Sequence, residues 1–254
     1  MQIKPASKNQ IKKRKKLLGG KYRNKEKLFL AEGLRAVQQI SDNGVIDVIE
    51  IFIEEGFDTK AVPVQNIPVF SASANDFAAI SDTESPQGII AVCKIPNQAE
   101  PNSLLNNDGV ILAFDAIQDP GNLGTMIRTA AWFDVKGLLM GTGTVDPFHP
   151  KVVRSTAGAT GAAPVISGDL DGILEKFEEK GWSVFLMDGS PESISLDRIK
   201  VPAKSIVIIG NEGSGISEKI YRGSRKKIKI EGRGLSVESL NASIACAIAL
   251  YRFC

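Results

Sequence analysis

The chain of 254 residues is long enough for one large domain or two small ones, and its apolar share of 43% and charged share of 24% are those of an ordinary globular protein. No segment approaches the roughly 20 apolar residues needed to cross a bilayer, and the N-terminus lacks the apolar core of a secretory signal, so we expect a cytoplasmic protein without a membrane partner. The scattered cysteines and the single His149 form no metal-ligand pattern, so no metal is expected; each cysteine is interpreted as a small buried hydrophobe or a free thiol, and His149 as a turn residue.

The net charge of +2 hides a concentration of positive charge near the N-terminus, where only Glu26 opposes a run of basic residues. These residues are Lys4, Lys8, Lys12, Lys13, Arg14, Lys15, Lys16, Lys21, Arg23, Lys25 and Lys27. A solvated basic tail is one interpretation, but so dense a stripe favours contact with a phosphate backbone, and therefore binding to a nucleic acid or the ribosome. The candidate RNA-binding residues in this stretch are Lys12, Lys13, Arg14 and Arg23.

The first part of the chain predicts a small α/β unit behind a basic extension. Hydrophobic periodicity and turn residues predict helices over 7–18, 32–40 and 74–80, and strands over 28–31, 45–53, 69–71 and 88–94. This alternation is typical of a compact α/β fold, and since it contains no catalytic constellation we expect it to bind rather than to react. We therefore expect a basic N-terminal extension (1–24), a substrate-binding domain (25–96) and a polar, proline-containing linker (97–106).

The second part of the chain predicts a larger α/β domain over 107–254. Its predicted strands are 110–114, 137–140, 182–187, 205–209 and 226–230, and its predicted helices are 121–133, 150–155, 170–180 and 244–253. Strands separated by helices imply a mainly parallel sheet with helices on both faces.

Three separated stretches of this domain carry polar residues at predicted strand ends or helix starts. Asn122 begins a predicted helix, and Arg128 lies six positions further along it. The glycine-rich segment 210–215 follows a buried strand, and Ser239 and Asn241 precede the last helix. Each feature alone has a plain structural interpretation as a capping residue, a surface arginine or a tight turn. Together they predict a ligand site at the carboxyl ends of the strands, where open α/β sheets usually bind their ligands.

These three stretches resemble the motifs of the SpoU/TrmH family of RNA 2′-O-ribose methyltransferases, which belong to the knotted SPOUT class. The family's first motif is similar to Asn122, Gly124 and Arg128, its second to the segment 210–215, and its third to the segment 238–241 with the helix behind it. The order and separation of the motifs also match. The resemblance implies that 107–254 form a knotted methyltransferase domain with a mainly parallel sheet.

The resemblance extends to the first part of the chain. Glu32-Gly33 and the segment 85–88 are similar to the small substrate-binding domain that often precedes the catalytic domain in this family. The implied activity is methyl transfer from S-adenosylmethionine to a ribose 2′-hydroxyl in RNA. Ribosomal RNA is the expected substrate, because the N-terminal part suits a structured target, and transfer RNA is the alternative.

The resemblance also implies a cofactor site made of backbone turns and aliphatic side chains. The residues expected at the cofactor are Met140, Gly141, Thr142, Ile209, Gly210, Ile228, Ile230 and Leu240. The family usually has a proline in the strand before the third motif, where this chain has Lys229, and the segment 231–237 is longer than usual. Either Ile228 or Ile230 can therefore be the residue that faces the adenine.

The catalytic residues implied by the resemblance are Arg128, Asn122, Glu212, Ser239 and Asn241. A guanidinium does not give up its proton at neutral pH, so we hypothesise that Arg128 grips the target phosphate and orients the hydroxyl, while a phosphate oxygen or water takes the proton. Glu212 is expected to orient Arg128, Asn122 to hold Arg128 or the ribose, and Ser239 and Asn241 to cap the last helix. Arg154 resembles a position near the substrate RNA, or is a surface arginine.

Further expectations concern assembly and the competing functions. In the family the last helix packs against its twin, so we expect a homodimer. A phosphate-binding NTPase built on the loop at Gly210 is disfavoured, because 214–217 lacks the Lys-Ser/Thr end of a P-loop. A non-catalytic RNA-binding protein of the same fold stays open as an alternative, although the motif residues are intact.

Overall fold

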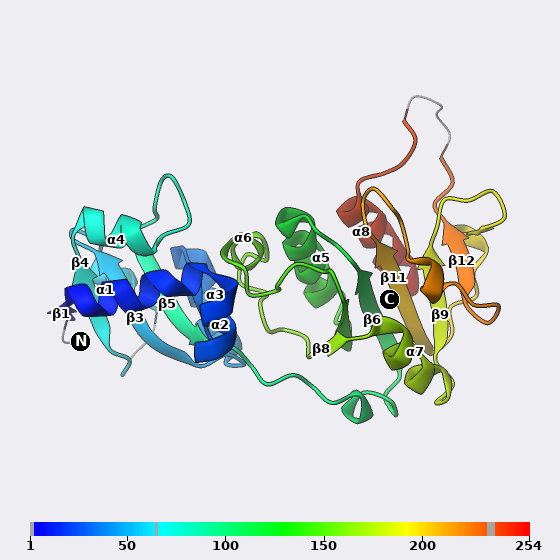
Figure 1. The fold of residues 1–254 in the computed structure, drawn as a ribbon, viewed down its shortest axis with the longest axis horizontal. Coiled ribbons are helices and arrows are strands. Elements are labelled where there is room, and N and C mark those ends of the chain that lie inside the picture. Colours follow the sequence, from blue (N-terminus) through cyan, green and yellow to red (C-terminus); the bar gives the residue numbers. More distant parts are fainter. Residues whose placement is uncertain (1–2, 64–65, 233–236) are drawn as a thin grey trace. The chain divides into compact units, whose positions relative to one another are not determined.

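The computed structural model describes residues 3–63, 66–232 and 237–254, and by contacts the chain divides into two compact units (Figure 1). Unit 1 comprises Met1–Asn97 together with Asp146–Ala162, and unit 2 comprises Gln98–Val145 together with Ala163–Cys254. The expected division at 97–106 is therefore incomplete, because a segment from the middle of the second part of the chain joins the first unit.

Unit 1 is built on a five-stranded mixed sheet with the order β1-β4-β3-β5-β2. β5 is antiparallel to both β2 and β3, whereas β4 is parallel to β3 and to the edge strand β1. The strands are β1 (Ile3–Pro5), β2 (Leu28–Glu32), β3 (Val48–Glu54), β4 (Val69–Ala72) and β5 (Ile89–Lys94). The pairing of β1 with β4 means that the basic N-terminal stretch begins inside the sheet rather than as a separate extension.

The helices of unit 1 cover both faces of this sheet. They are α1 (Lys8–Lys15), α2 (Gly20–Glu26), α3 (Leu34–Asn43), α4 (Ala74–Ile80) and α6 (Pro150–Ser155), with a 3₁₀ turn η1 (Lys16–Leu18) after α1. Ile11 and Leu17 pack with Phe77 of α4 on one face, and Val37 and Ile40 of α3 pack on the other. The predicted helix 7–18 is therefore confirmed as α1 plus η1, whereas α2 was not predicted.

The segment Asp146–Ala162 belongs to unit 1 for identifiable reasons. Val153 of α6 lies fully inside the core that contains α3, and the Phe148 ring packs 5.1 Å from the ring of Phe29 in β2. The Asp146 carboxylate accepts hydrogen bonds from the Arg23 guanidinium at 2.9 and 2.8 Å. An apolar face and one ion pair therefore connect this segment to residues more than a hundred positions earlier in the chain.

Unit 2 contains a seven-stranded sheet with the order β10-β12-β9-β11-β6-β7-β8, and every pairing in it is parallel. The strands are β6 (Gly109–Asp115), β7 (Gly137–Gly141), β8 (Val165–Gly168), β9 (Ser183–Met187), β10 (Ile194–Ser195), β11 (Lys204–Gly210) and β12 (Lys226–Lys229). The predicted parallel α/β architecture is thus confirmed. β8 and β10 are short strands that the sequence pattern did not reveal.

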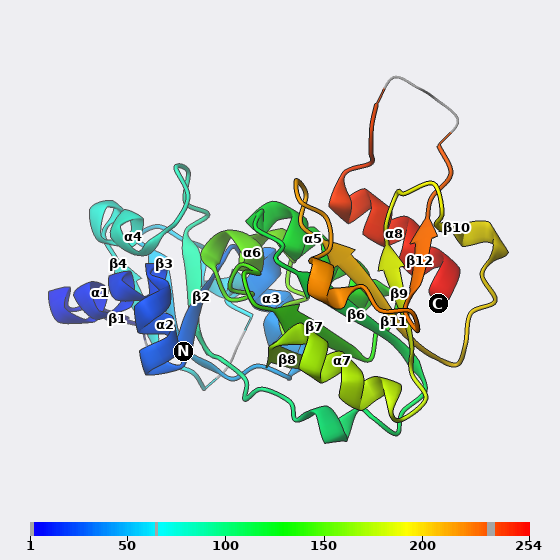
Figure 2. The same cartoon turned by 45° about the vertical axis from the view of Figure 1, so that its right-hand side comes forward.

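Helices cover both faces of this sheet, as Figures 1 and 2 show. α7 (Leu170–Glu178) buries Leu174 and Phe177 against alternate residues of the strands, including Ile206 and Ile208. α5 (Pro120–Trp132) and α8 (Ala242–Phe253) contact each other, α8 also contacts β11, and the Phe253 ring packs 4.9 Å from Phe185. Because successive side chains of a strand point to opposite faces of the sheet, each apolar strand packs against the helices on both faces.

The predicted linker 97–106 is packed against unit 2. Leu104 and Leu105 are both buried in the core that contains α7, and the Trp182 indole N–H donates to the Leu105 carbonyl at 3.0 Å. The polar composition of this stretch concealed the apolar pair at its end. Among the cysteines, Cys93 and Cys246 are buried and Cys254 is exposed, and burial raises the pKa of the Cys93 thiol to about 12.

Candidate active site

The candidate site lies at the carboxyl edge of the unit 2 sheet, where β7, β6 and β11 end side by side. In the parallel register Gly210 of β11 pairs with Asp115 of β6, and Phe114 pairs with Met140 of β7. Because parallel strands end at the same edge, the loops that follow them converge although they are far apart in sequence. The candidate site residues predicted in the three stretches lie on these loops and on the helices that follow.

The loop after β11 is a tight turn that only glycine permits at its start. A Cβ on Gly210 would lie 2.5–2.6 Å from backbone atoms of Gly215 and Ile216, closer than real Cβ atoms come. Asn211 and Gly215 exchange backbone hydrogen bonds of 2.9 and 3.0 Å, which closes the turn. The tip of the turn therefore presents Glu212 to solvent.

The Asn211 side chain fixes the inside of this turn. Its carbonyl oxygen accepts the N–H groups of Gly213 and Ser214 at 2.9 and 3.0 Å, and its amide donates to the Ala116 carbonyl at 2.8 Å. Ala116 has a φ of 57°, an uncommon conformation for a residue with a side chain. One asparagine thus connects the turn after β11 to the turn after β6.

Asp115 anchors the other end of the same loop. Its carboxylate is buried, with 3% of the residue exposed, and accepts both the backbone N–H of Ser217 at 2.6 Å and the Ser217 hydroxyl. A buried carboxylate left without such donors would carry a large desolvation cost. Asp115 and Ser217 were not predicted as site residues, and Asn211, which lies in the predicted segment 210–215, was given no role. For Asp115 the available signal was an acidic residue that ends an otherwise apolar strand.

The start of α5 differs from the prediction in one detail. Asp119, not Asn122, caps the helix: its carboxylate accepts the Asn122 backbone N–H at 2.7 Å, and Pro120 occupies the first turn. Proline is favoured at this position because its missing N–H is not needed there. The Asn122 side chain is consequently released from capping and can face the other loops.

Asn122 joins the three motif stretches through a chain of hydrogen bonds. Its amide donates to Glu212 Oε1 at 3.0 Å, and its carbonyl oxygen accepts from the Asn241 amide at 3.1 Å. Asn241 caps α8 in turn, because its carbonyl oxygen accepts the backbone N–H and hydroxyl of Ser243 at 2.9 and 2.6 Å. The Asn241 amide thus donates to Asn122, and the Asn122 amide donates to Glu212, whose carboxylate ends the chain as a charge-assisted acceptor.

Arg128 does not make the contact that was predicted for it. Glu212 takes Asn122 as its partner, and within the described residues Arg128 has neither an ion pair nor a hydrogen bond. Six positions of an α-helix rotate a side chain by about 240° and advance it by roughly 9 Å, so Asn122 and Arg128 project in different directions. The Arg128 side chain is exposed and available to a ligand.

Ser239 and Leu240 precede the cap of α8 and are exposed. The predicted capping role of Ser239 is wrong, since Asn241 alone caps the helix and Ser239 makes no hydrogen bond within the described chain. Leu240 leaves 46% of its surface exposed beside this cap. An exposed leucine at the mouth of a polar site is a surface that a flat aromatic ligand can cover.

The residues expected at the cofactor divide into core and surface positions. Met140, Ile209 and Ile228 are buried, and a Cβ on the buried Gly141 would lie 2.8 Å from the Phe114 carbonyl, so these residues shape the edge of the sheet. Thr142 is exposed, and Ile230 is half-buried just beyond the end of β12. Glycine turns with aliphatic side chains at their rim fit a flat, apolar ring whose polar edge forms hydrogen bonds with backbone groups. Residues 233–236, within the stretch noted as unusually long, lie outside the described residues.

Next to Ile228, a polar cluster holds the loop after β9. Burial opposes ionisation of Asp188, but hydrogen bonds from the Ser190 N–H and the Tyr221 hydroxyl, and the nearby charge of Lys227, hold its pKa below the usual value. Burial and the bond to Asp188 raise the pKa of Tyr221 to about 12, so its hydroxyl stays a donor. The Asp188 backbone N–H donates to the Ile228 carbonyl at 2.9 Å, which ties this cluster to β12.

The predicted RNA-binding residues of unit 1 fall into two groups. Arg23 is only 2% exposed and donates to Asp146 and to the carbonyls of Leu17 and Leu18, and Arg14 forms a largely buried ion pair with Glu50. These two guanidinium groups are therefore used by the protein itself, which corrects the prediction for them. By contrast, Lys12 and Lys13 are exposed.

Arg154, the remaining predicted RNA contact, is partly exposed and pairs with Asp82 at 3.3 Å.

Within the described ranges no cluster of three or more His, Cys, Asp or Glu side chains could hold a metal ion. In those same ranges no helix is long and apolar enough to span a membrane.

Comparison with known proteins identifies the family. The model of the SpoU rRNA Methylase family matches residues 109–251, and that of the MRM3-like substrate binding domain matches residues 8–91. The chain is 32% identical over 254 residues to the 23S rRNA (guanosine(2553)-2′-O)-methyltransferase RlmP of Bacillus subtilis, with 98% of each chain covered.

Solved structures agree with this result. A putative RNA methyltransferase of the TrmH family from Porphyromonas gingivalis superposes with a TM-score of 0.85, at 32% identity and 98% coverage of both chains. The AdoMet-bound rRNA methyltransferase from Sinorhizobium meliloti shares the fold, with a TM-score of 0.85 at 23% identity and coverage of 99% of this chain and 96% of that one. From its sequence motifs to its fold, the chain belongs to the SpoU rRNA methylase family.

Proposed function

We propose that this protein transfers a methyl group from S-adenosylmethionine to a ribose 2′-hydroxyl of ribosomal RNA. The observation that carries the proposal is the hydrogen-bond chain Asn241–Asn122–Glu212, which joins all three motif stretches at the carboxyl edge of one parallel sheet. The relatives RlmP of Bacillus subtilis and RlmB of Coxiella burnetii are both named as 23S rRNA guanosine 2′-O-methyltransferases. Their names support a guanosine of the large ribosomal RNA as the target.

The cofactor, when bound, supplies an activated methyl group on sulfur. We assign its adenine to the surface between Ile230 and Leu240, because these two aliphatic side chains retain exposed area whereas Ile228 is fully buried. The turns at Gly141-Thr142 and Gly210 supply backbone groups to the edge of the ring. Ile230, rather than Ile228, is thus the isoleucine that faces the adenine in this proposal.

In the proposed reaction the hydrogen-bond chain holds the site in shape and Arg128 binds the RNA. The exposed Arg128 guanidinium, which has no protein partner among the described residues, grips the phosphate next to the target ribose through its fork of donors. Glu212, Asn122 and Asn241 fix the turn and the helix cap that surround the hydroxyl. The proton of the hydroxyl leaves to a phosphate oxygen or to water, since a guanidinium is a very poor base.

The proposed assembly is a homodimer formed through α8. Ile244, Ile248 and Tyr251 follow each other at spacings of four and three residues on one helix face and are 51%, 37% and 80% exposed. Trp132, at the end of the contacting helix α5, is 85% exposed. Covering such an apolar face by a second copy removes it from water, so Ile248→Glu is expected to convert a dimer into a monomer in sedimentation velocity. The trefoil knot and the cytoplasmic location stay predictions.

Methyl transfer to defined RNA tests the proposed function. The purified protein and labelled S-adenosylmethionine are incubated with ribosomal RNA and, separately, with transfer RNA from cells that lack the protein, and blocked 2′ positions are then mapped. Label at one ribose of ribosomal RNA is expected, and its loss in Asn122→Ala connects the reaction to the site. Label in transfer RNA alone would identify transfer RNA, and not ribosomal RNA, as the substrate. Cofactor binding by calorimetry without any transfer would favour the non-catalytic alternative.

A further inference from the structure

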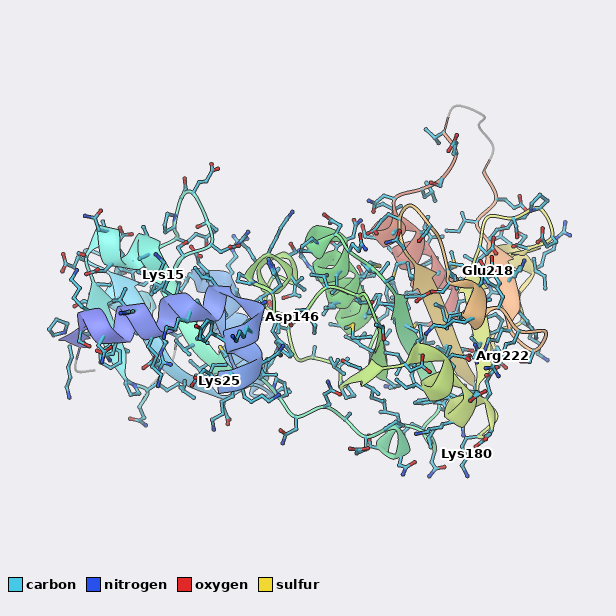
Figure 3. The ribbon with its side chains drawn as sticks, viewed as in Figure 1. Lys15, Lys25, Asp146, Lys180, Glu218 and Arg222 are labelled. Atoms are coloured by element: carbon cyan, nitrogen blue, oxygen red, sulfur yellow. The ribbon has the colours of Figure 1, made fainter. Side chains whose placement is uncertain are left out.

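A basic groove runs between α1 and α2 on the surface of unit 1. It encloses about 390 Å³ and is lined by Asn9, Lys12, Lys13, Lys16, Tyr22, Lys25 and Glu26. Figure 3 labels Lys25, which lines the groove, and Lys15, a lysine of α1 that does not. We call this feature the basic groove.

The groove is preformed because its two walls are tied together beneath the surface. Gly19 adopts an extended conformation between η1 and α2, which lets the chain reverse and start a second helix at once. The buried Arg23 guanidinium of α2 then donates to the carbonyls of Leu17 and Leu18 at 2.9 and 2.8 Å. The Leu17 side chain is buried below, so the walls are held at a fixed separation without a ligand.

The described part of the protein does not neutralise the charges of the groove. Within it, Lys12, Lys13, Lys16 and Lys25 form no ion pair, whereas Arg14, Arg23 and Lys8 each have an acidic partner. Glu26 is the one acidic side chain in the described lining. Four unpaired ammonium groups along one cleft produce a positive potential that attracts a polyanion.

One aromatic ring stands among these ammonium groups. Tyr22 is half-buried, and the Lys16 Nζ lies 5.4 Å from its ring centroid, within the range of a cation–π contact. Lysines that follow a backbone and an aromatic platform on which a base stacks are the two components of a single-strand binding site. A base in a duplex is already stacked on its neighbours and cannot use such a platform.

We propose that the basic groove binds a single-stranded RNA segment of the substrate, with phosphates on the four lysines and a base stacked on Tyr22. This inference rests on the proposed function, because it treats the groove as a second contact to the RNA that is methylated in unit 2. An acidic peptide satisfies the lysines equally well but leaves the ring without a partner. The stacking platform therefore distinguishes RNA from an acidic protein.

The charge contribution is tested with the full-length protein and a 12-nucleotide single strand of uridines. The variant Lys12→Gln/Lys13→Gln/Lys16→Gln/Lys25→Gln is expected to lower affinity more than tenfold at 0.1 M salt. It should also reduce the log–log salt slope by roughly 3, because each phosphate that is no longer neutralised removes about 0.7 from the slope. Lys15→Gln, on the same helix but outside the groove, is the matched control and is expected to change affinity less than twofold. Equal reductions per lysine inside and outside the groove would overturn the proposal.

The stacking contribution is tested at Tyr22. Tyr22→Leu is expected to weaken binding of the single strand about tenfold, and Tyr22→Phe to retain it, because the ring and not the hydroxyl stacks. Duplex RNA of the same length should bind more weakly than the single strand and respond less to Tyr22→Leu. Competition by polyglutamate as effective as that by the oligonucleotide, or identical effects of Leu and Phe, would contradict a base-stacking groove.

The outcome for the groove is separable from the outcome for the proposed function. The oligonucleotide measurements require no methyl transfer, so they decide the groove even if the wild-type protein methylates nothing. Where wild-type transfer is observed, the quadruple variant is expected to need more than tenfold more ribosomal RNA for half-maximal transfer. Unchanged cofactor affinity and thermal unfolding would show that unit 2 and the fold are intact, and an unchanged RNA requirement would overturn the inference.

Discussion

The two units use their positive charges in opposite ways. In unit 2 the proposed chemistry depends on one exposed cation, Arg128, whose position is set by a helix beside a fixed chain of polar side chains. In unit 1 the proposed RNA contact depends on four lysines that share the basic groove, and no single one of them is unique. A reaction requires one geometry, whereas attraction of a polyanion requires only summed charge.

Among the described residues each unit also has one fully buried arginine, and the partners of these two residues differ. Arg23 in unit 1 joins Asp146, which keeps 29% of its side chain exposed, and two backbone carbonyls. Arg225 in unit 2 has no exposed side-chain surface and joins both Asp171 and Glu178 of α7. Positive charge in the sequence therefore indicates neither function nor surface position until its partners are known.

The largest effect is expected at Arg128. Arg128→Ala should lower turnover about a thousandfold and Arg128→Lys about a hundredfold, because an ammonium cannot reproduce the planar fork and small misplacements are costly in a reacting geometry. Single-turnover methyl transfer measures both, with Arg198→Lys, an exposed arginine elsewhere in unit 2, as the control. Near-normal turnover in Arg128→Lys would show that unit 2, like unit 1, needs only charge.

The next largest effects are expected at the two buried arginines, whose replacement should lower the free energy of unfolding by different amounts. Arg225→Met leaves two carboxylates without their main partner and is expected to cost about 3 kcal/mol of stability. Arg23→Met should cost less, about 2 kcal/mol, because water can reach Asp146. Arg222→Met, which removes an exposed partner of Asp171 and Glu175, is the control and should cost the least of the three, because water screens its ion pairs; Figure 3 labels Arg222. Urea unfolding measures the free energy of unfolding of all three variants. Equal costs for Arg225→Met and Arg23→Met would show that the different partners of the two buried arginines do not affect stability.

The glycine turn offers a matched pair within one loop. Gly210→Ala drives a Cβ into the backbone of Gly215, so the turn must move, and cofactor affinity is expected to fall about tenfold, or roughly 1.4 kcal/mol. Gly213→Ala meets nothing closer than 3.6 Å and should bind the cofactor as the wild type does. Isothermal calorimetry compares the two. Similar reductions in both variants would argue that loop flexibility, not the close approach at Gly210, matters.

Acid should weaken unit 2 through Asp188. Its pKa is lower in the folded protein than in the unfolded chain, so its stabilisation is present above the unfolded value of about 3.9 and is lost as the pH falls through the folded value. Asp188→Asn is expected to cost about 1 kcal/mol at pH 7, and this cost should shrink as the pH falls below about 3.9. Unfolding curves between pH 2.5 and pH 7 provide the test, and a cost independent of pH would contradict the assignment.

The smallest effect is expected from single lysines of the basic groove. Lys13→Gln should weaken binding of a single-stranded RNA only two- to threefold at 0.1 M salt, because the remaining lysines continue to attract the strand. Glu26→Gln should strengthen it by a similar factor, since it removes the acidic side chain of the described lining. Fluorescence anisotropy across a salt series measures both. A hundredfold reduction from one lysine would make unit 1 as position-dependent as unit 2.

Much of this molecule was predictable from local patterns. Apolar runs bounded by glycine predict β6, β7 and β11, because a buried parallel strand must be apolar on both faces. The turn at Gly210 and the cap at Asn241 follow from the backbone freedom of glycine and the capping geometry of asparagine, which depend on a few neighbouring residues. The motif resemblance then brought the three stretches together as one site before any contact was known.

What the local patterns could not decide was which side chain meets which across long separations. Asn122 selects Glu212 and Asn241, 90 and 119 positions away, while Arg128 bonds to neither; Arg23 and Arg14 become structural, while Lys12 stays exposed. The segment Asp146–Ala162 likewise joins unit 1 through Val153 and Arg23. A residue's own neighbours set its backbone conformation, but its partner depends on how two distant surfaces pack, and that arrangement exists only in the folded chain.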